Sequence, residues 1–160
     1  MSEEVNVLKG EVEPYWVMGG VIDVKLDSAK TGGAFTLMEI TNPPGVGVPP
    51  HVHGLDDETV ILVDGTLTAI LGDSVESMTP GDVVFIPRGV VHAFEAGKNG
   101  ARVIALTSPG GSESMLREGA PSKVGEVGPS EIGEAEIGVL MKAAAGAGLN
   151  FLPPEESSSE

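Results

Sequence analysis

Residues 45–65 read GVGVPPHVHGLDDETVILVDG and carry the strongest pattern in the chain. His51 and His53 are two residues apart, so on an extended strand both imidazole rings project from the same face. Glu58 follows five residues after His53 and opens the apolar run Thr59–Val63. Burying a carboxylate at the head of such a run is costly without a cation, which favours Glu58 as a metal ligand.

A second stretch, residues 81–96, reads GDVVFIPRGVVHAFEA and contains His92, the remaining histidine of the chain. Three imidazoles and one carboxylate that converge would bind a divalent transition metal, because these ligand types suit such ions. We therefore predict one ion per subunit, held by His51, His53, Glu58 and His92. The ligand types leave its identity open among Fe, Ni, Mn, Co, Cu and Zn.

Short apolar runs cut by Gly and Pro fill the chain from about Tyr15 to Thr107 and predict an all-β sandwich or barrel. Asp64-Gly65 separates two of these runs and is a strong signal for a two-residue hairpin. Two further tight turns are expected at 71–74 and 80–82. The predicted strands cover residues 21–26, 34–40, 59–63, 66–71, 83–86 and 102–107.

The hydrophobic period changes after residues 109–111, and short helices are expected in the C-terminal part. Ser112 is a candidate N-cap for a helix over 112–118, and Ser130 for a second helix. The apolar stripe of this second helix would consist of Ile132, Ala135, Val139 and Leu140, extending toward Ala143 and Ala144.

These patterns divide the chain into four parts. They are an N-terminal segment (1–13), the barrel (14–108), a helical extension (109–148) and a C-terminal segment (149–160). The acidic, serine-rich end of the last segment is expected to be disordered, on composition.

The composition excludes several classes of function. The chain has 160 residues, a formal net charge of −15 and no cysteine. Disulfides, thiolate metal sites and cysteine nucleophiles are therefore excluded, and the acidity argues against binding to nucleic acid or anionic membranes. The N-terminus is acidic where a secretory signal is basic, and no apolar stretch approaches the roughly 18 residues that span a bilayer. We expect a cytoplasmic protein.

Nine positions at fixed spacing in residues 45–65 and 81–96 resemble the two conserved motifs of the cupin superfamily. They read Gly45-x5-His51-x-His53-x4-Glu58-x6-Gly65 and Gly81-x5-Pro87-x-Gly89-x2-His92. The chain departs from the family at Ala96, where Asn is usual. The resemblance implies a double-stranded β-helix, or jelly-roll barrel, with the metal inside.

A closer resemblance, to single-domain quercetinase-like cupins, covers nearly the whole chain. It is carried by residues 14–18, 31–35, 49–53, 87–94 and 149–154. This resemblance implies a homodimer, in line with the prevalence of two-fold homo-oligomers. Many relatives have aromatic residues after the ligand glutamate, where this chain has Thr59-Val60-Ile61, so we expect a wider and less aromatic cavity than a flavonol site.

A set of apolar side chains is expected to face the inside of the barrel and to line a substrate cavity with few polar anchors. Its members are Tyr15, Phe35, Leu37, Val60, Leu62, Phe85 and Phe94, with ordinary barrel core as the alternative for each. By the same family resemblance, Tyr15 and Trp16 would line the cavity mouth or exchange onto a partner subunit. Asp56 and Asp57 are expected in a solvated loop and Arg88 on the rim.

By resemblance, the function is that of a metal-dependent dioxygenase acting with dioxygen on a flavonol-like or enolisable, oxygen-rich small molecule. Glu58 is the candidate catalytic base, because no histidine remains for that role. Two alternatives stay open, since one barrel hosts many chemistries. One is a non-oxidative cyclase, isomerase or lyase, and the other is a non-catalytic cupin that binds a small ligand.

Overall fold

The computed structural model describes residues 4–8, 11–120 and 133–153. Within these ranges the chain forms nine strands and two helices. The strands are β1 (Glu13–Val17), β2 (Gly20–Leu26), β3 (Thr36–Asn42), β4 (Gly47–His53), β5 (Asp57–Leu71), β6 (Ser74–Met78), β7 (Val83–Ile86), β8 (His92–Ser108) and β9 (Leu149–Phe151). The helices are α1 (Ser114–Gly119) and α2 (Glu134–Gly146).

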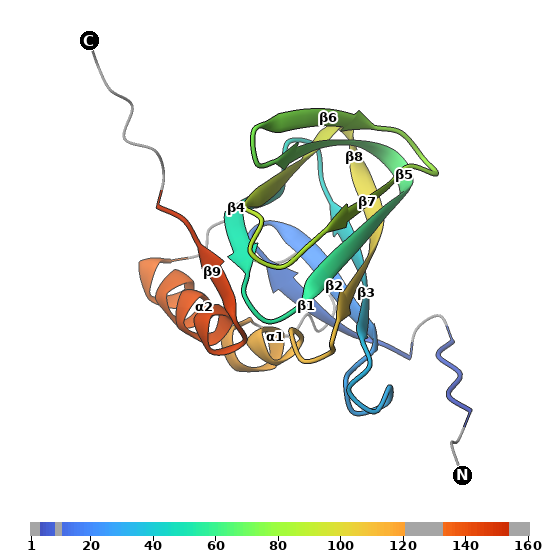
Figure 1. Cartoon of the computed structure of the whole chain (residues 1–160), viewed down its shortest axis with the longest axis vertical. Coiled ribbons are helices and arrows are strands. Elements are labelled where there is room, and N and C mark those ends of the chain that lie inside the picture. Colours follow the sequence, from blue (N-terminus) through green and yellow to red (C-terminus); the bar gives the residue numbers. More distant parts are fainter. Residues whose placement is uncertain (1–3, 9–10, 121–132, 154–160) are drawn as a thin grey trace.

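The strands form an antiparallel sheet that curls into a barrel (Figure 1). Its main path runs β1-β2-β3-β8-β4-β9, and β5 pairs with β6, β7 and β8. The 17-residue strand β8 pairs with β3, β4 and β5 and so joins the parts of the barrel. The predicted all-β barrel of the jelly-roll type is confirmed.

Inward side chains of β5 and β8 form the centre of the core. Val60 and Leu62 are buried opposite their register partners Ala105 and Val103, which are buried as well. This alternation of buried and exposed positions is the period of two that a strand imposes. It places Glu58, two residues before Val60, on the same inward face.

The expected hairpin at Asp64-Gly65 is wrong, because β5 continues from Asp57 to Leu71 and pairs with β8. The pairing changes register on both sides of this point, as at a β-bulge. Gly65 has a φ of +81°, and a Cβ there would lie 2.1 Å from the carbonyl oxygen of Gly100. Gly65, in a left-handed backbone conformation, therefore bends the long strand β5 and does not reverse the direction of the chain.

The other two expected turns are confirmed. Leu71 pairs with Ser74 across the tight turn between β5 and β6. Before β7, the backbone N–H of Asp82 donates to the carbonyl oxygen of Thr79 and closes the turn at residues 80–81.

Strands β3 and β7 form near their expected positions but present the opposite face to the core. In β3, Met38 is buried, whereas Leu37 lies on the other face and is half-buried. In β7, Ile86 is buried and Phe85 is 63% exposed. The expectation that Leu37 and Phe85 face the interior is therefore wrong, because a shift of one residue exchanges the two faces of a strand.

The C-terminal helices differ in detail from the prediction. Helix α1 begins at Ser114, with Glu113 at the N-cap position and no side-chain cap, so Ser112 is not its cap. In α2, Leu140 lies in the buried stripe as expected, together with Ala143 and Ala144, whereas Ala135 and Val139 are exposed and lie outside it. The predicted cap Ser130, Ile132 and the acidic tail at 154–160 lie outside the described residues.

Strand β9 was not predicted and closes one edge of the barrel. It follows α2 and pairs with β4, with Leu149 opposite His53 and Phe151 opposite His51. Figure 1 shows α1, α2 and β9 gathered at one end of the barrel. The C-terminal part of the chain thus reaches the strand that carries two of the predicted ligands.

Candidate metal centre

The four predicted ligands lie together inside the barrel, although they come from three strands. His51 and His53 are on β4, Glu58 is the second residue of β5, and His92 is the first residue of β8. All four are buried, and one ligating atom from each lies within 4.8 Å of the others. Across residues 4–8, 11–120 and 133–153, no other group of three such side chains is close enough to share an ion.

The local sequence of β4 explains why both of its histidines face inward. Alternation along the strand places His51 and His53 on the same buried face. Pro49-Pro50 has no N–H to donate, and the pairing of β4 with β8 changes register there. On its other edge, β4 is held by β9, where the ring centroid of Phe151 lies 5.6 Å from that of His51.

Each imidazole is oriented by a hydrogen bond at Nδ1. His51 and His92 each donate to the carbonyl oxygen two residues earlier in the chain, at 2.9 Å. His53 Nδ1 lies 2.5 Å from Oδ1 of Asp56. Because these oxygens accept, Nδ1 carries a proton in each ring, and Nε2 is the nitrogen that faces the cluster and can bind a metal once it carries no proton. The donor set therefore fits a divalent transition metal.

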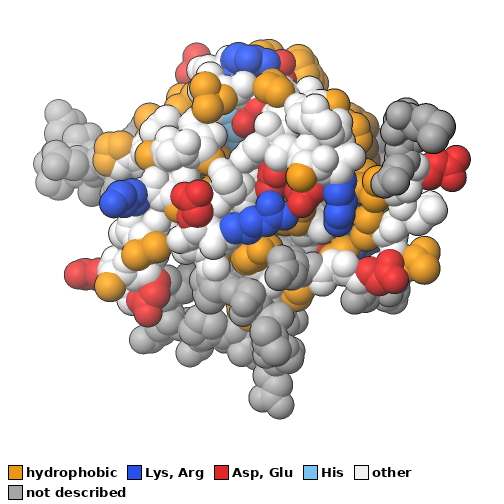
Figure 2. Space-filling model, turned by 90° about the horizontal axis from the view of Figure 1, so that it is seen from below, with side chains coloured by type: hydrophobic (Ala, Val, Ile, Leu, Met, Phe, Trp, Pro, Cys, Tyr) orange, Lys and Arg blue, Asp and Glu red, His pale blue; other side chains and the backbone are white. Residues whose placement is uncertain are grey.

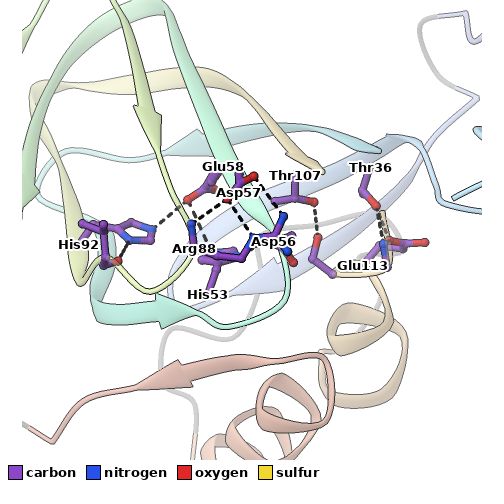
Figure 3. A network of polar contacts seen from close by, with 12 residues as sticks. Thr36, His53, Asp56, Asp57, Glu58, Arg88, His92, Thr107 and Glu113 are labelled. Carbon is purple, nitrogen blue, oxygen red and sulfur yellow. Dashed lines mark hydrogen bonds and ion pairs between the residues drawn. The ribbon is translucent and has the colours of Figure 1, made fainter. Parts of the chain in front are cut away.

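Glu58 lies between two of the rings. Its Oε2 is 2.9 Å from Nε2 of His92 and 3.6 Å from Nε2 of His53 (Figure 3). Burial alone would raise the pKa of the Glu58 carboxyl, but the hydrogen bond from His92 and the charges of the histidines lower it below its usual value. Glu58 is thus held as a carboxylate, which can ligate a metal or accept a proton.

The two histidines of β4 have pKa values shifted in opposite directions. Burial and the neighbouring His92 lower the pKa of His51 to about 4. Burial also opposes a charge on His53, but the hydrogen bond to Asp56 and the charge of Glu58 outweigh it and raise the pKa of His53. Of these two ligands, His53 therefore takes up a proton at the higher pH.

Three residues of the cluster, His51, His53 and Glu58, form part of the wall of a cavity inside the barrel. The empty space amounts to about 890 Å³, including the part that opens to solvent. Apolar side chains from β1 to β5, β8, β9 and α1 line it, and Asn42 and Ser112 are its polar side chains outside the cluster. Among the residues that the structure describes, no Lys or Arg lines this cavity.

The sequence around these ligands is similar to a known family. Residues 38–107 match the cupin domain. Over these residues the barrel is similar to a cupin domain. The match spans Glu58 and all three histidines, so the whole ligand cluster lies within the matched region.

One curated relative aligns with most of the chain. Over 144 residues the chain is 27% identical to quercetin 2,3-dioxygenase of Bacillus subtilis (strain 168). This alignment covers 89% of the present chain and 43% of that protein. The chain spans less than half the length of the curated relatives it matches.

Solved structures share the cupin fold at low sequence identity. KdgF from Halomonas sp. has a TM-score of 0.59 and 21% identity, covering 64% of this chain and 93% of that one. The polyketide cyclase RemF from Streptomyces resistomycificus has a TM-score of 0.59 and 24% identity, covering 67% and 80%. At these identities the similarity supports a common fold and not a common activity.

The expected substrate residues are only partly at the cupin cavity. Val60 and Phe94 line it. The other five lie elsewhere in the described structure: Tyr15 and Leu62 in the buried core, Phe35 and Leu37 half-buried outside the lining, and Phe85 on the exposed outer face.

Several lining residues were missed by the sequence reasoning. Met18 lies in the turn between β1 and β2 with a φ of +49°, a conformation that no sequence pattern indicates for methionine. Met115 and Leu116 of α1 also line the cavity, as do Leu149 and Phe151 of β9. The alternation Leu149-Asn150-Phe151 could have indicated a strand, although it is short.

Asp56 and Asp57 were expected together in a solvated loop but lie in different environments (Figure 3). Asp57 accepts hydrogen bonds from the backbone N, Nε and Nη2 of Arg88, at 2.9 to 3.1 Å, at the surface. This pair joins the start of β5 to the turn that precedes His92, and the Arg88 side chain is exposed. Asp56 is 4% exposed, so a solvated loop is wrong for this residue.

The surface of the molecule agrees with the acidic composition. On the face shown in Figure 2, Lys and Arg side chains lie beside Asp and Glu and form no extended basic patch. A nucleic-acid site would need such a patch on the face that it uses. Within the described ranges, neither helix has the length and apolar character required to cross a membrane.

Proposed function

We propose that this cupin is a metal-dependent dioxygenase that acts on a flavonol-like or otherwise enolisable, oxygen-rich small molecule. His51, His53, Glu58 and His92 would hold one divalent transition ion per subunit. The observation that carries this proposal is the convergence of the four ligating groups, of which His51, His53 and Glu58 lie on the wall of an apolar cavity with no cationic side chain in its described lining.

The lining selects the class of substrate. A phosphate or carboxylate group would find no Lys or Arg in the described lining to neutralise it. A polyphenol or an enolisable carbonyl compound instead buries its rings against side chains such as Val60, Phe94 and Phe151, with few polar anchors. An ionisable hydroxyl group of the substrate would then face the cluster.

Glu58 is the proton acceptor in this proposal. A divalent ion bound to three imidazoles and one carboxylate would keep a residual charge of +1 and polarise an enol or phenol oxygen. The carboxylate of Glu58, buried beside that position and held ionised, would take the proton from the substrate hydroxyl. The enolate produced is electron-rich and can react with dioxygen, which in a flavonol leads to ring cleavage.

The similarity to quercetin 2,3-dioxygenase supports the same class of reaction. The homodimer and the cytoplasmic location stay predictions.

The test is incubation of the metal-replete protein with quercetin, with and without air, while oxygen uptake and flavonol absorbance are followed. We expect loss of absorbance with matching oxygen uptake in air only, and none in chelator-treated protein. Absence of uptake by metal-replete protein would contradict the proposal. Turnover without oxygen would contradict it too, in favour of a cyclase, isomerase or lyase.

A further inference from the structure

One of the three ligand histidines is oriented differently from the other two. His51 and His92 donate from Nδ1 to backbone carbonyl oxygens, which are fixed by the strands themselves. His53 donates to a side chain, the carboxylate of Asp56, at 2.5 Å. At Nδ1, His53 is therefore the only one of the three rings whose partner is the side chain of another residue.

The surroundings of Asp56 do not explain a buried charge at this position. The residue is 4% exposed, and a buried carboxylate is unfavourable unless hydrogen bonds and an opposite charge compensate it. Within the described part of the chain, His53 is the only basic residue with a nitrogen within 4.0 Å of this carboxylate. His53 is therefore the nearest group that can compensate this carboxylate, and Arg88 acts on it as a more distant positive charge.

The neighbouring carboxylate has a different role. Asp57 points to the surface, where its partner is the guanidinium of Arg88. The adjacent aspartates thus have different partners, Asp56 the predicted ligand His53 and Asp57 the exposed Arg88 (Figure 3). Substitutions of Asp56 and of its neighbour Asp57 can therefore be compared as a test and its matched control.

We propose that Asp56 is a positioning residue of the metal centre. Its carboxylate fixes the ring of His53 so that Nε2 faces Glu58, and it strengthens Nε2 as a donor by accepting the Nδ1 proton. With Glu58 it brings two negative charges to the site, which balance a divalent ion. The inference rests on the metal centre of the proposed function and adds a residue to it.

The test measures metal affinity and does not depend on turnover. Zn²⁺ affinity is determined by competition with a chelator, and the visible spectrum of the Co²⁺-loaded protein reports the ligand geometry. We expect Asp56→Ala to weaken Zn²⁺ binding by about 10- to 100-fold and to change the Co²⁺ spectrum. Asp56→Asn retains an acceptor oxygen, so we expect it to restore the wild-type spectrum but not the full affinity. Asp57→Asn, the control, should bind as the wild type does.

Thermal unfolding of each metal-free variant shows whether it is folded. If Asp56→Ala does not fold, the metal affinity of Asp56→Asn is used to decide whether Asp56 contributes to the metal centre. Wild-type affinity and spectrum in a folded Asp56→Ala protein would overturn the inference, as would wild-type affinity in Asp56→Asn if Asp56→Ala does not fold. A wild-type protein that takes up neither Zn²⁺ nor Co²⁺ would overturn the metal centre itself, and with it this inference. The two failures are therefore distinguishable.

Discussion

Oε2 of Glu58 and Nε2 of His92 lie 2.9 Å apart, although the two residues are 34 positions apart in the chain. This contact does not follow the ladder between their strands, because Glu58 pairs with Thr107 at the far end of β8 and His92 pairs with Leu71 at the far end of β5. The contact between Glu58 and His92 crosses the barrel interior instead, because the curled sheet brings the start of β5 close to the start of β8. The four ligand side chains thus come together because the sheet closes into a barrel.

Replacing Glu58 by Gln should abolish most of the turnover. The amide keeps the size of the side chain but is neither a base nor a negative ligand, and loss of a general base costs about 10²- to 10⁴-fold in rate. The measurement is oxygen uptake with quercetin at saturating metal. Glu95→Gln, an exposed carboxylate on β8, is the control. Turnover by Glu58→Gln within about threefold of wild type would exclude Glu58 as the base.

Phe151→Ala should weaken the binding of an aromatic substrate without removing the metal. The ring lines the cavity beside His51, and aromatic packing of this kind contributes about 0.5–1.5 kcal/mol beyond the buried area. We expect the Kd for quercetin to rise several-fold with unchanged metal content. Phe85→Ala, on the exposed face of β7, should leave both quantities unchanged. An equal effect of the two substitutions would show that Phe151 is not part of the binding site.

Gly65→Ala should destabilise the barrel more than Gly72→Ala does. Both glycines have positive φ, a conformation that costs other residues about 1–2 kcal/mol. A Cβ at Gly72 meets nothing within 4 Å, whereas one at Gly65 would collide with the Gly100 backbone. The free energy of unfolding, measured by urea denaturation, should fall by about 1 kcal/mol for Gly72→Ala and by at least about 2 kcal/mol for Gly65→Ala. Equal losses would argue against the bulge.

Glu113→Gln should destabilise the protein in a pH-dependent way. Glu113 is 2% exposed and accepts hydrogen bonds from Ser28, Thr36 and the backbone N–H of Gly111. Burial alone would raise the pKa of its carboxyl, but the hydrogen bonds from Ser28 and Thr36 lower it below 4.5. A lowered pKa in the folded state means that this stabilisation is present above pH 4.5 and is lost as the pH falls through the folded pKa.

At pH 7 we therefore expect Glu113→Gln to lower the free energy of unfolding by about 1–3 kcal/mol. The difference from wild type, followed by urea denaturation, should shrink as the pH falls below 4.5. A difference that stays constant across that range would mean that the charge of Glu113 does not contribute to stability.

The sequence predicted the ligands better than the cavity around them, for physical reasons. The spacing His51-x-His53 fixes which face both rings share, because a strand alternates strictly. The run Val83–Ile86 offers no polar residue to mark the outer face, and in Ala34–Ile40 the two polar residues, Thr36 and Glu39, lie on opposite faces. Leu37 and Phe85 are therefore assigned to the wrong face from sequence alone. The part of the cavity built by β9 depends on tertiary pairing with β4, which three residues of local sequence cannot specify.

The hairpin signal at Asp64-Gly65 failed for a similar reason. A glycine with positive φ serves a turn or a bulge equally well, and only pairing with β8 decides between them. In the same way, Asp56 and Asp57 are chemically identical in the sequence, and the fold alone buries one of them beside His53.

Elemental analysis of the purified protein beside its His92→Ala variant tests the central claim most directly. If His51, His53, Glu58 and His92 form one metal centre, the wild type should contain close to one divalent transition ion per chain after metal loading. Removal of one ligand should then lower the metal content sharply in a variant that remains folded. Equal metal content in the two proteins would contradict the four-residue centre.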